Sequence, residues 1–207
     1  MSVKQPHAED WLLAPPITSV DLPMSDEEVR ISVGVRLGAL LCQQQICVCR
    51  TKVDVRGIHG QSCRKNAGRH IRHNSINDIV WRAMRRAGIQ SIKEPLGLLR
   101  DDGKRPDGVR MIPWSRGRCV ALDVTVQDTF TATHLPLTFI TPSAAADRAE
   151  TNKKMKYQLL TQTHTFTLLA VETTAAFNTE ASKFLQDIGR RCIEATRDIE
   201  EMAYLFQ

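Results

Sequence analysis

The sequence contains no run of eighteen or more apolar residues, so no membrane-spanning helix is expected. Its first ten residues, MSVKQPHAED, lack the basic-then-apolar order of a secretory signal. Internal repeats and low-complexity tracts are also missing. These absences favour an intracellular protein without a membrane partner. A chain of 207 residues, 42% hydrophobic and 25% charged, suits one folded domain with at most a small appendage.

Six cysteines without a secretory signal are more typical of thiols or metal ligands than of a disulfide framework. Four positions follow the pattern C-x-C-x9-H-x3-C, which predicts a tetrahedral Zn²⁺ site that could fold a segment too small for its own core. The alternative is three reduced cysteines and a surface histidine, and nearby residues could replace a ligand. The predicted ligands are Cys47, Cys49, His59 and Cys63, with Cys42, His70 and His73 as substitutes.

Positive charge is concentrated in one part of the chain. The segment from Arg50 to Arg118 carries 17 Lys and Arg against 6 Asp and Glu, a net +11, which leaves −6 for the remainder. Such a block favours contact with a polyanion, DNA or RNA, although a solvated arginine-rich surface explains it equally well. Cations between the cysteine cluster and the next helix would hold phosphates without reading sequence, namely Arg64, Lys65, Arg69 and Arg72.

The apolar pattern predicts three segments: an N-terminal arm and helix over 1–41, a zinc knuckle with a basic segment over 42–72, and a main domain over 73–207. Ser25 and Glu28 form a possible capping box that opens the first helix. In the main domain we expect helices over 74–88, 143–163 and 178–206, and strands over 91–99, 109–114, 118–126 and 164–173. This order predicts an α/β fold with a small mixed sheet flanked by helices.

Two aspartates stand on the arms of a predicted hairpin. Asp107 follows Pro106 at the start of one arm, and Asp123 lies inside the apolar run of the other. Whether they share a face depends on the strand register, which the sequence does not fix. Converging carboxylates repel each other unless a cation such as Mg²⁺ lies between them. Alternatively, R-P-D-G forms an ordinary turn and Asp123 only accepts hydrogen bonds from its neighbours.

The Arg105-Pro106-Asp107 stretch, followed by an acid on the next strand, resembles the PD-(D/E)XK pattern of restriction-like nucleases. More narrowly, residues 47–192 resemble the endonuclease region of site-specific non-LTR retrotransposons, downstream of their reverse transcriptase. The resemblance is carried by CVC…HGQSC, GRHIRHNSINDIVWRA, EPLGLLRDDGKRPDG, GRCVALDVTV and KKMKY. It implies a DNA-nicking endonuclease that uses Mg²⁺ or Mn²⁺, preceded by a CCHC zinc knuckle. It further implies nuclear residence and allows the chain to be part of a larger reverse-transcriptase polyprotein.

One departure from the pattern concerns the lysine that should follow two residues after the second acid, where this chain has Thr125. The retrotransposon group is similar in placing lysines on the following helix, which here matches Lys153 and Lys156. Lys156 is the first choice for orienting water or neutralising phosphate, and Lys153 the second. The resemblance also suggests a third metal-binding acid and two nucleic-acid contacts, namely Glu94, Arg105 and Tyr157. An exposed residue before Pro95 is an equally good interpretation of Glu94.

A different class of function remains open. The same fold and knuckle could bind DNA or RNA without cutting it, and the missing strand lysine favours this alternative. Retention of both aspartates and of KKMKY favours the enzyme. A third class, a protein-interaction scaffold built on the terminal helix, predicts indifference to nucleic acid.

Overall fold

The structure is a computed structural model that describes residues 5–13, 24–63, 65–66, 68–98, 105–114 and 117–206. Arg64, one of the predicted phosphate contacts, lies outside the described residues, as do parts of the predicted N-terminal arm. No helix in the described part of the chain combines the length and apolar character needed to cross a bilayer.

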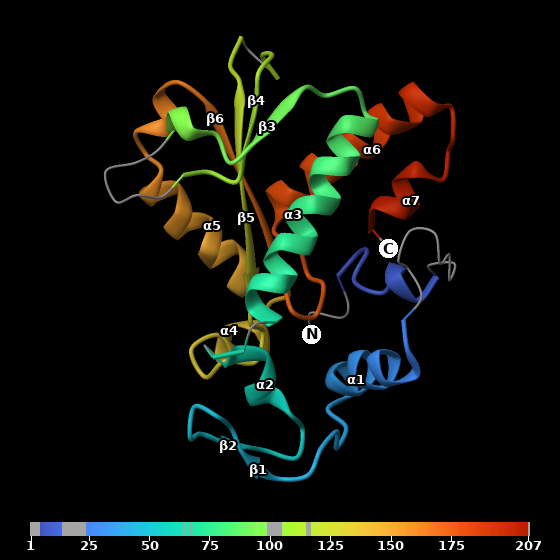
Figure 1. Cartoon of the computed structure of the whole chain (residues 1–207), viewed down its shortest axis with the longest axis vertical. Coiled ribbons are helices and arrows are strands. Elements are labelled where there is room, and N and C mark those ends of the chain that lie inside the picture. Colours follow the sequence, from blue (N-terminus) through green and yellow to red (C-terminus); the bar gives the residue numbers. More distant parts are fainter. Residues whose placement is uncertain are drawn as a thin grey trace.

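A four-stranded mixed sheet forms the centre of the main domain (Figure 1). The strands β3 (Ser91–Lys93), β4 (Gly108–Arg110) and β5 (Val120–Gln127) pair antiparallel, and β6 (Thr165–Glu172) pairs parallel to β5. Helices α3 (Gly68–Arg86) and α6 (Thr179–Thr196) cover one face, and α5 (Ala144–Lys156) covers the other. The prediction of an α/β fold with a mixed sheet between helices is therefore confirmed.

The remaining elements are short or peripheral. The N-terminal part contains η2 (Asp10–Leu13) and α1 (Asp26–Leu37), which begins at the predicted capping box of Ser25 and Glu28. The knuckle contains β1 (Gln45–Ile46), β2 (Lys52–Val53) and α2 (Ile58–Ser62). Further turns of helix connect the main elements or end the described chain: η4 (Leu96–Leu98), α4 (Leu135–Thr138), η5 (Leu160–Gln162) and α7 (Glu201–Phe206).

Several predicted boundaries were wrong. The strand expected over 109–114 ends at Arg110, and the strand expected over 91–99 ends at Lys93, because Pro95 cannot donate to a ladder and η4 follows. Helix α3 begins at Gly68, inside the segment assigned to the knuckle. The terminal helix is broken at Arg197, which has a left-handed φ of 64°.

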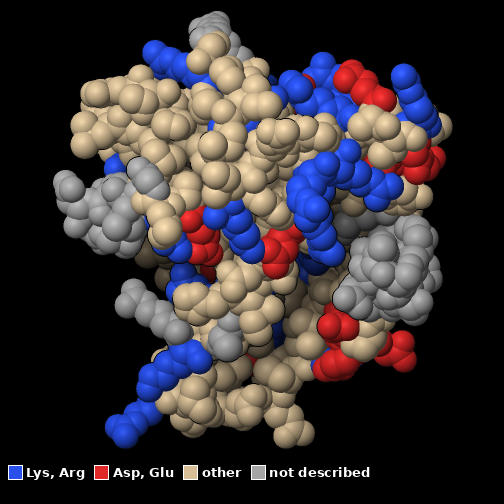
Figure 2. All heavy atoms as spheres, turned by 45° about the horizontal axis from the view of Figure 1, so that its top comes forward, with Lys and Arg blue, Asp and Glu red and all other residues tan. Residues whose placement is uncertain are grey.

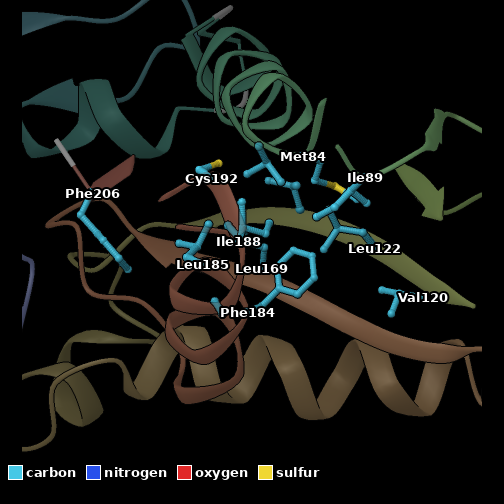
Figure 3. Packing of buried hydrophobic residues seen from close by; sticks show 13 residues of the cluster. Met84, Ile89, Val120, Leu122, Leu169, Phe184, Leu185, Ile188, Cys192 and Phe206 are labelled. Atoms are coloured by element: carbon cyan, nitrogen blue, oxygen red, sulfur yellow. The ribbon is translucent and has the colours of Figure 1, made fainter. Parts of the chain in front are cut away.

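Strand β5 separates two apolar clusters by simple alternation of its side chains. The first cluster packs β5 against α3 and α6 through Val120, Leu122 and Val124. Leu169 of β6 and Ile188 of α6 are fully buried in it (Figure 3). The opposite side of β5 faces α5 through small residues, chiefly Ala121, Ala146 and Ala149. Asp123 lies on this α5 side because it alternates with Leu122 and Val124. The fold thus directs one acid of the predicted pair towards the helix that carries the lysines.

Leu169 tests how much of the stability comes from the α3–α6 cluster. Its side chain is 0% exposed, so Leu169→Ala should lower the free energy of unfolding by about 2–5 kcal/mol. Leu159 is 78% exposed, and Leu159→Ala is the matched control, with an expected change within about 0.5 kcal/mol. Urea unfolding followed by circular dichroism measures both. Equal losses in the two variants would contradict the assigned core.

Candidate zinc centre and acidic site

The knuckle brings its four predicted ligands together. Cys47 and Cys49 lie in the turn between β1 and β2, where Arg50 adopts a left-handed φ of 69°. His59 lies on α2, and Cys63 caps the C-terminus of that helix. The Sγ atoms of Cys47 and Cys63 are 3.6 Å apart, and Sγ of Cys49 lies 3.1 Å from Nε2 of His59. All four ligand atoms lie within 4.8 Å of one another.

Edges of a zinc tetrahedron are about 3.5–3.8 Å for sulfur and nitrogen ligands at ordinary bond lengths. The 3.6 Å separation of the Cys47 and Cys63 sulfurs lies in this range, and small side-chain movements would bring the other pairs to it. Zinc binds thiolates, and hydrogen bonds from Thr51 lower the pKa of the Cys49 thiol to about 6. Among the described residues this is the one group of three or more Cys, His, Asp or Glu side chains that could hold a metal ion. The ligand set is compatible with zinc, and the proposed substitutes Cys42, His70 and His73 do not belong to it.

Asp107 lies in the bend that leads into β4. Its Oδ2 accepts a hydrogen bond from the backbone N–H of Val124 at 2.7 Å and lies 3.2 Å from Nε2 of His73 on α3. The carboxylate therefore satisfies a backbone N–H of β5 at a position just before β4 begins. Its contact with His73 raises the pKa of that imidazole to about 9. His73 was expected only as a substitute zinc ligand, and its role beside Asp107 was missed.

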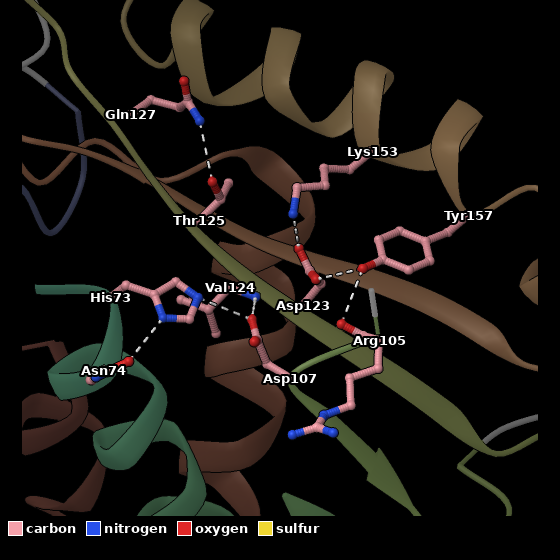
Figure 4. A network of polar contacts seen from close by, with 10 residues as sticks. All are labelled: His73, Asn74, Arg105, Asp107, Asp123, Val124, Thr125, Gln127, Lys153 and Tyr157. Carbon is pink, nitrogen blue, oxygen red and sulfur yellow. Dashed lines mark hydrogen bonds and ion pairs between the residues drawn. The ribbon is translucent and has the colours of Figure 1, made fainter. Parts of the chain in front are cut away.

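Asp123 is buried, with 3% of its surface exposed. Its Oδ2 accepts a hydrogen bond from Nζ of Lys153 at 2.6 Å. Its Oδ1 lies 3.1 Å from the hydroxyl of Tyr157, which is also 3.2 Å from the carbonyl oxygen of Arg105 (Figure 4). Burial raises the pKa of Asp123, and the ammonium group of Lys153 offsets part of this rise. Both oxygens are held from α5, which fixes the direction of the carboxylate.

Asp107, just before β4, and Asp123 of β5 occupy facing positions on neighbouring strands. Gly108 pairs with Leu122, so the same antiparallel register continued by one residue sets Asp107 opposite Asp123. Figure 4 shows Asp107 turned towards His73 and Asp123 turned towards Lys153, with the chain at Val124 between them. The charge of Asp107 nevertheless raises the pKa of Asp123, and the charge of Asp123 raises that of His73. Four side chains therefore interact electrostatically: His73, Asp107, Asp123 and Lys153.

The lysines of α5 differ in their partners. Lys153 forms the ion pair with Asp123, and Lys156 lines a groove together with Lys153. Both ammonium groups lie about equally far from the Tyr157 ring, at 5.9 Å for Lys153 and 5.8 Å for Lys156. Lys154 forms ion pairs with Glu150 and Glu180 instead. Contact with the acid therefore favours Lys153 over the first choice, Lys156.

Glu94 does not gather with the aspartates. Its side chain is 52% exposed and forms an ion pair with Arg105, which thereby has a partner of its own. The backbone N–H of Glu94 donates to the carbonyl oxygen of Asp107 at 2.8 Å, so the residue is near the site through its main chain only. The described residues contain no third carboxylate close enough to complete a metal site with this pair.

The remaining predicted nucleic-acid contacts divide by exposure. Lys65 and Arg69 are exposed, whereas Arg72 is partly buried and donates to the carbonyl oxygen of Gln61 at 2.9 Å. Tyr157 is 2% exposed, so it positions Asp123 and offers no ring to a base. Figure 2 shows Lys and Arg side chains separated by Asp and Glu on the face in view, so the basic segment does not make a uniform basic surface there.

A search of protein-family models and a search of curated proteins both find no match for this chain.

Zinc content tests the knuckle directly. Cys63→Ser should abolish stoichiometric zinc binding and expose α2 and the β1–β2 hairpin to protease, because metal binding supplies the folding free energy of such a segment. Cys119→Ser is the matched control, since Cys119 lies outside the ligand group. Elemental analysis of purified protein measures the metal. Retention of one zinc per chain in Cys63→Ser would contradict the assignment.

The His73–Asp107 contact predicts a pH dependence. The pKa of His73 is raised in the folded chain, so its stabilisation is complete below about pH 6.5, the ordinary histidine value, and is lost as the pH rises through about 9. Nuclear magnetic resonance without added divalent ions should give a His73 midpoint of about 9. Asp107→Asn should bring it back towards about 6.5. An ordinary midpoint in the unsubstituted protein would show that the contact is not formed.

Proposed function

We propose that this chain is an endonuclease domain of the restriction-like class that hydrolyses phosphodiester bonds in DNA. The observation that carries the proposal is the buried ion pair of Asp123 with Lys153, next to Asp107, whose carboxylate accepts a hydrogen bond from the β5 backbone at Val124. The order of α3, three antiparallel strands, α5 and a parallel fourth strand supports it, since this order is similar to the restriction-like core.

Lys153 supplies the ammonium group that the strand position of the nuclease signature lacks in this chain. Thr125 stands where the PD-(D/E)XK signature has its lysine, and the ammonium group of Lys153 reaches the second acid from α5 instead. At this position it can donate to a phosphate oxygen or hold a water for attack. Tyr157 keeps the Asp123 carboxylate oriented, and His73 balances the charge of Asp107. Lys156 then contributes to binding along the neighbouring groove.

The donor set is suited to a hard cation such as Mg²⁺ or Mn²⁺. Such ions are bound by one or two carboxylates together with phosphate and water oxygens. The two carboxylates point towards different helices, so Asp107 would have to turn away from His73 to hold the ion together with Asp123. Oδ1 of Asp107 has no hydrogen-bond partner among the described residues. A bound ion would supply a hydroxide and stabilise the charge that develops on the phosphate.

A second function has one observation in its favour. Asp123 is paired with Lys153 and Asp107 with His73, so the charges of the aspartates are already compensated by side chains of the chain. A module that binds DNA or RNA without cutting it would need no metal ion at these carboxylates. Under the nuclease proposal, origin in a retrotransposon reverse-transcriptase polyprotein and nuclear residence follow from the resemblance of residues 47–192 described above.

A nicking assay distinguishes the two functions. With supercoiled plasmid and Mg²⁺, Asp107→Asn, Asp123→Asn and Lys153→Met should each slow nicking about 10²–10³-fold, because each removes a preorganised electrostatic group. Lys154→Met on the same helix is the control and should retain activity, since Lys154 pairs with Glu150 and Glu180 instead. Circular dichroism and zinc content verify folding. Equal nicking by all variants would end the catalytic assignment. Salt-sensitive binding without nicking would favour the module.

A further inference from the structure

A groove of about 420 Å³ lies along α5, beside the acidic site. One wall is formed by α5, and the other by the end of β5 and the loop that follows it. Lys153, which pairs with Asp123, is one of the lining residues. The α5 wall consists of Ala145, Arg148, Ala149, Asn152, Lys153 and Lys156, and the opposite wall of Gln127, Thr133 and His134.

The basic side chains of α5 that line the groove lie on a different face of the helix from its acidic side chains. Arg148, Asn152 and Lys156 follow one another at a spacing of four residues, which places them in one row on the helix. The acids of the helix point elsewhere, because Asp147 accepts from Ser143 at 2.8 Å and Glu150 binds Lys154 at 2.6 Å. Among the described residues, no acidic side chain lines the groove. The row is therefore a cationic stripe on one wall of a groove whose other wall is polar and uncharged.

A second groove, of about 440 Å³, continues from the first. Gln127 and His134 line both grooves, and the second also contains Arg69, Arg72 and His73 near the beginning of α3. Lys153 in the first groove contacts Asp123, and His73 in the second contacts Asp107. Neither aspartate lines a groove, but each contacts a lining residue, so the grooves reach the acidic pair from two sides. The second groove is also lined by Asp128, so the first is the more uniformly cationic.

We propose that the α5 groove binds the sugar-phosphate backbone of a single DNA strand, with Arg148 and Lys156 on its phosphates and Asn152 between them. The inference deepens the proposed nuclease function and takes from it only the role of the acidic pair. The row from residue 148 to 156 rises by about 12 Å, which corresponds to about three phosphates of one strand. With cations on one wall only, the strand lays its backbone on α5 and its bases towards Thr133 and His134.

Binding of a short fluorescein-labelled single-stranded DNA, followed by anisotropy without added Mg²⁺, tests the groove apart from cleavage. Arg148→Ala/Lys156→Ala should weaken binding about tenfold. The slope of log K against log salt should become shallower by about 1.4, because two phosphate contacts are lost. Arg82→Ala/Lys183→Ala removes the same charge from α3 and α6 at positions that line neither groove. It should change the affinity less than about twofold. Arg148→Lys should restore most of the binding lost in Arg148→Ala.

Indistinguishable affinities and slopes for the two double variants would overturn the proposal. A duplex that binds more tightly than the single strand, and loses as much in the α5 variant, would overturn the choice of a single strand. If the α5 variant loses binding while the parent protein never nicks DNA, the groove assignment holds and the nuclease proposal fails. If the parent nicks DNA and both double variants bind it equally, the nuclease holds and the groove assignment fails.

Discussion

The ion pair between Asp123 and Lys153 holds a carboxylate in the middle of β5, where Asp123 is only 3% exposed. Removing an ion from water costs several kcal/mol, and leaving it without a partner costs more. Helix α5 provides the partners, because Lys153 and Tyr157 at its C-terminal end reach the two oxygens of Asp123. Apolar packing alone gives no reason for an acid at this position.

Helix α5 is held close to the sheet by small side chains and by one buried acid. Ala146 and Ala149 pack on Ala121 of β5, so the helix approaches nearer than larger residues would allow. At its beginning, the carboxylate of Glu172 at the end of β6 accepts a hydrogen bond from the backbone N–H of Ala145 at 3.0 Å. A negative group at a helix N-terminus also interacts favourably with the helix dipole. These contacts fix the register that lets Lys153 meet Asp123.

Patterns of short range carried most of the correct predictions. The apolar pattern predicted a strand over 118–126, and Ser25 with Glu28 predicted the start of α1. Spacing alone predicted the group that could hold a metal ion, namely Cys47, Cys49, His59 and Cys63. Predictions that depended on the relative placement of elements were weaker. Lys153 and Lys156 share a helix face, so only the docking of α5 decides which one meets the acid. His73 stands 34 residues before Asp107, and no local pattern connects them.

The zinc centre and the acidic site share a continuous piece of chain. Cys63 ends α2, α3 begins five residues later at Gly68, and His73 follows in the second turn of α3 with its imidazole against Asp107. Arg72 ties the two helices by donating to the carbonyl oxygen of Gln61. Metal binding in such a knuckle is folding free energy, so an ion held by Cys63 also restrains the beginning of α3. A metal ion in the knuckle would therefore support the acidic site through the helix that presents His73, although the two sites have no side chain in common.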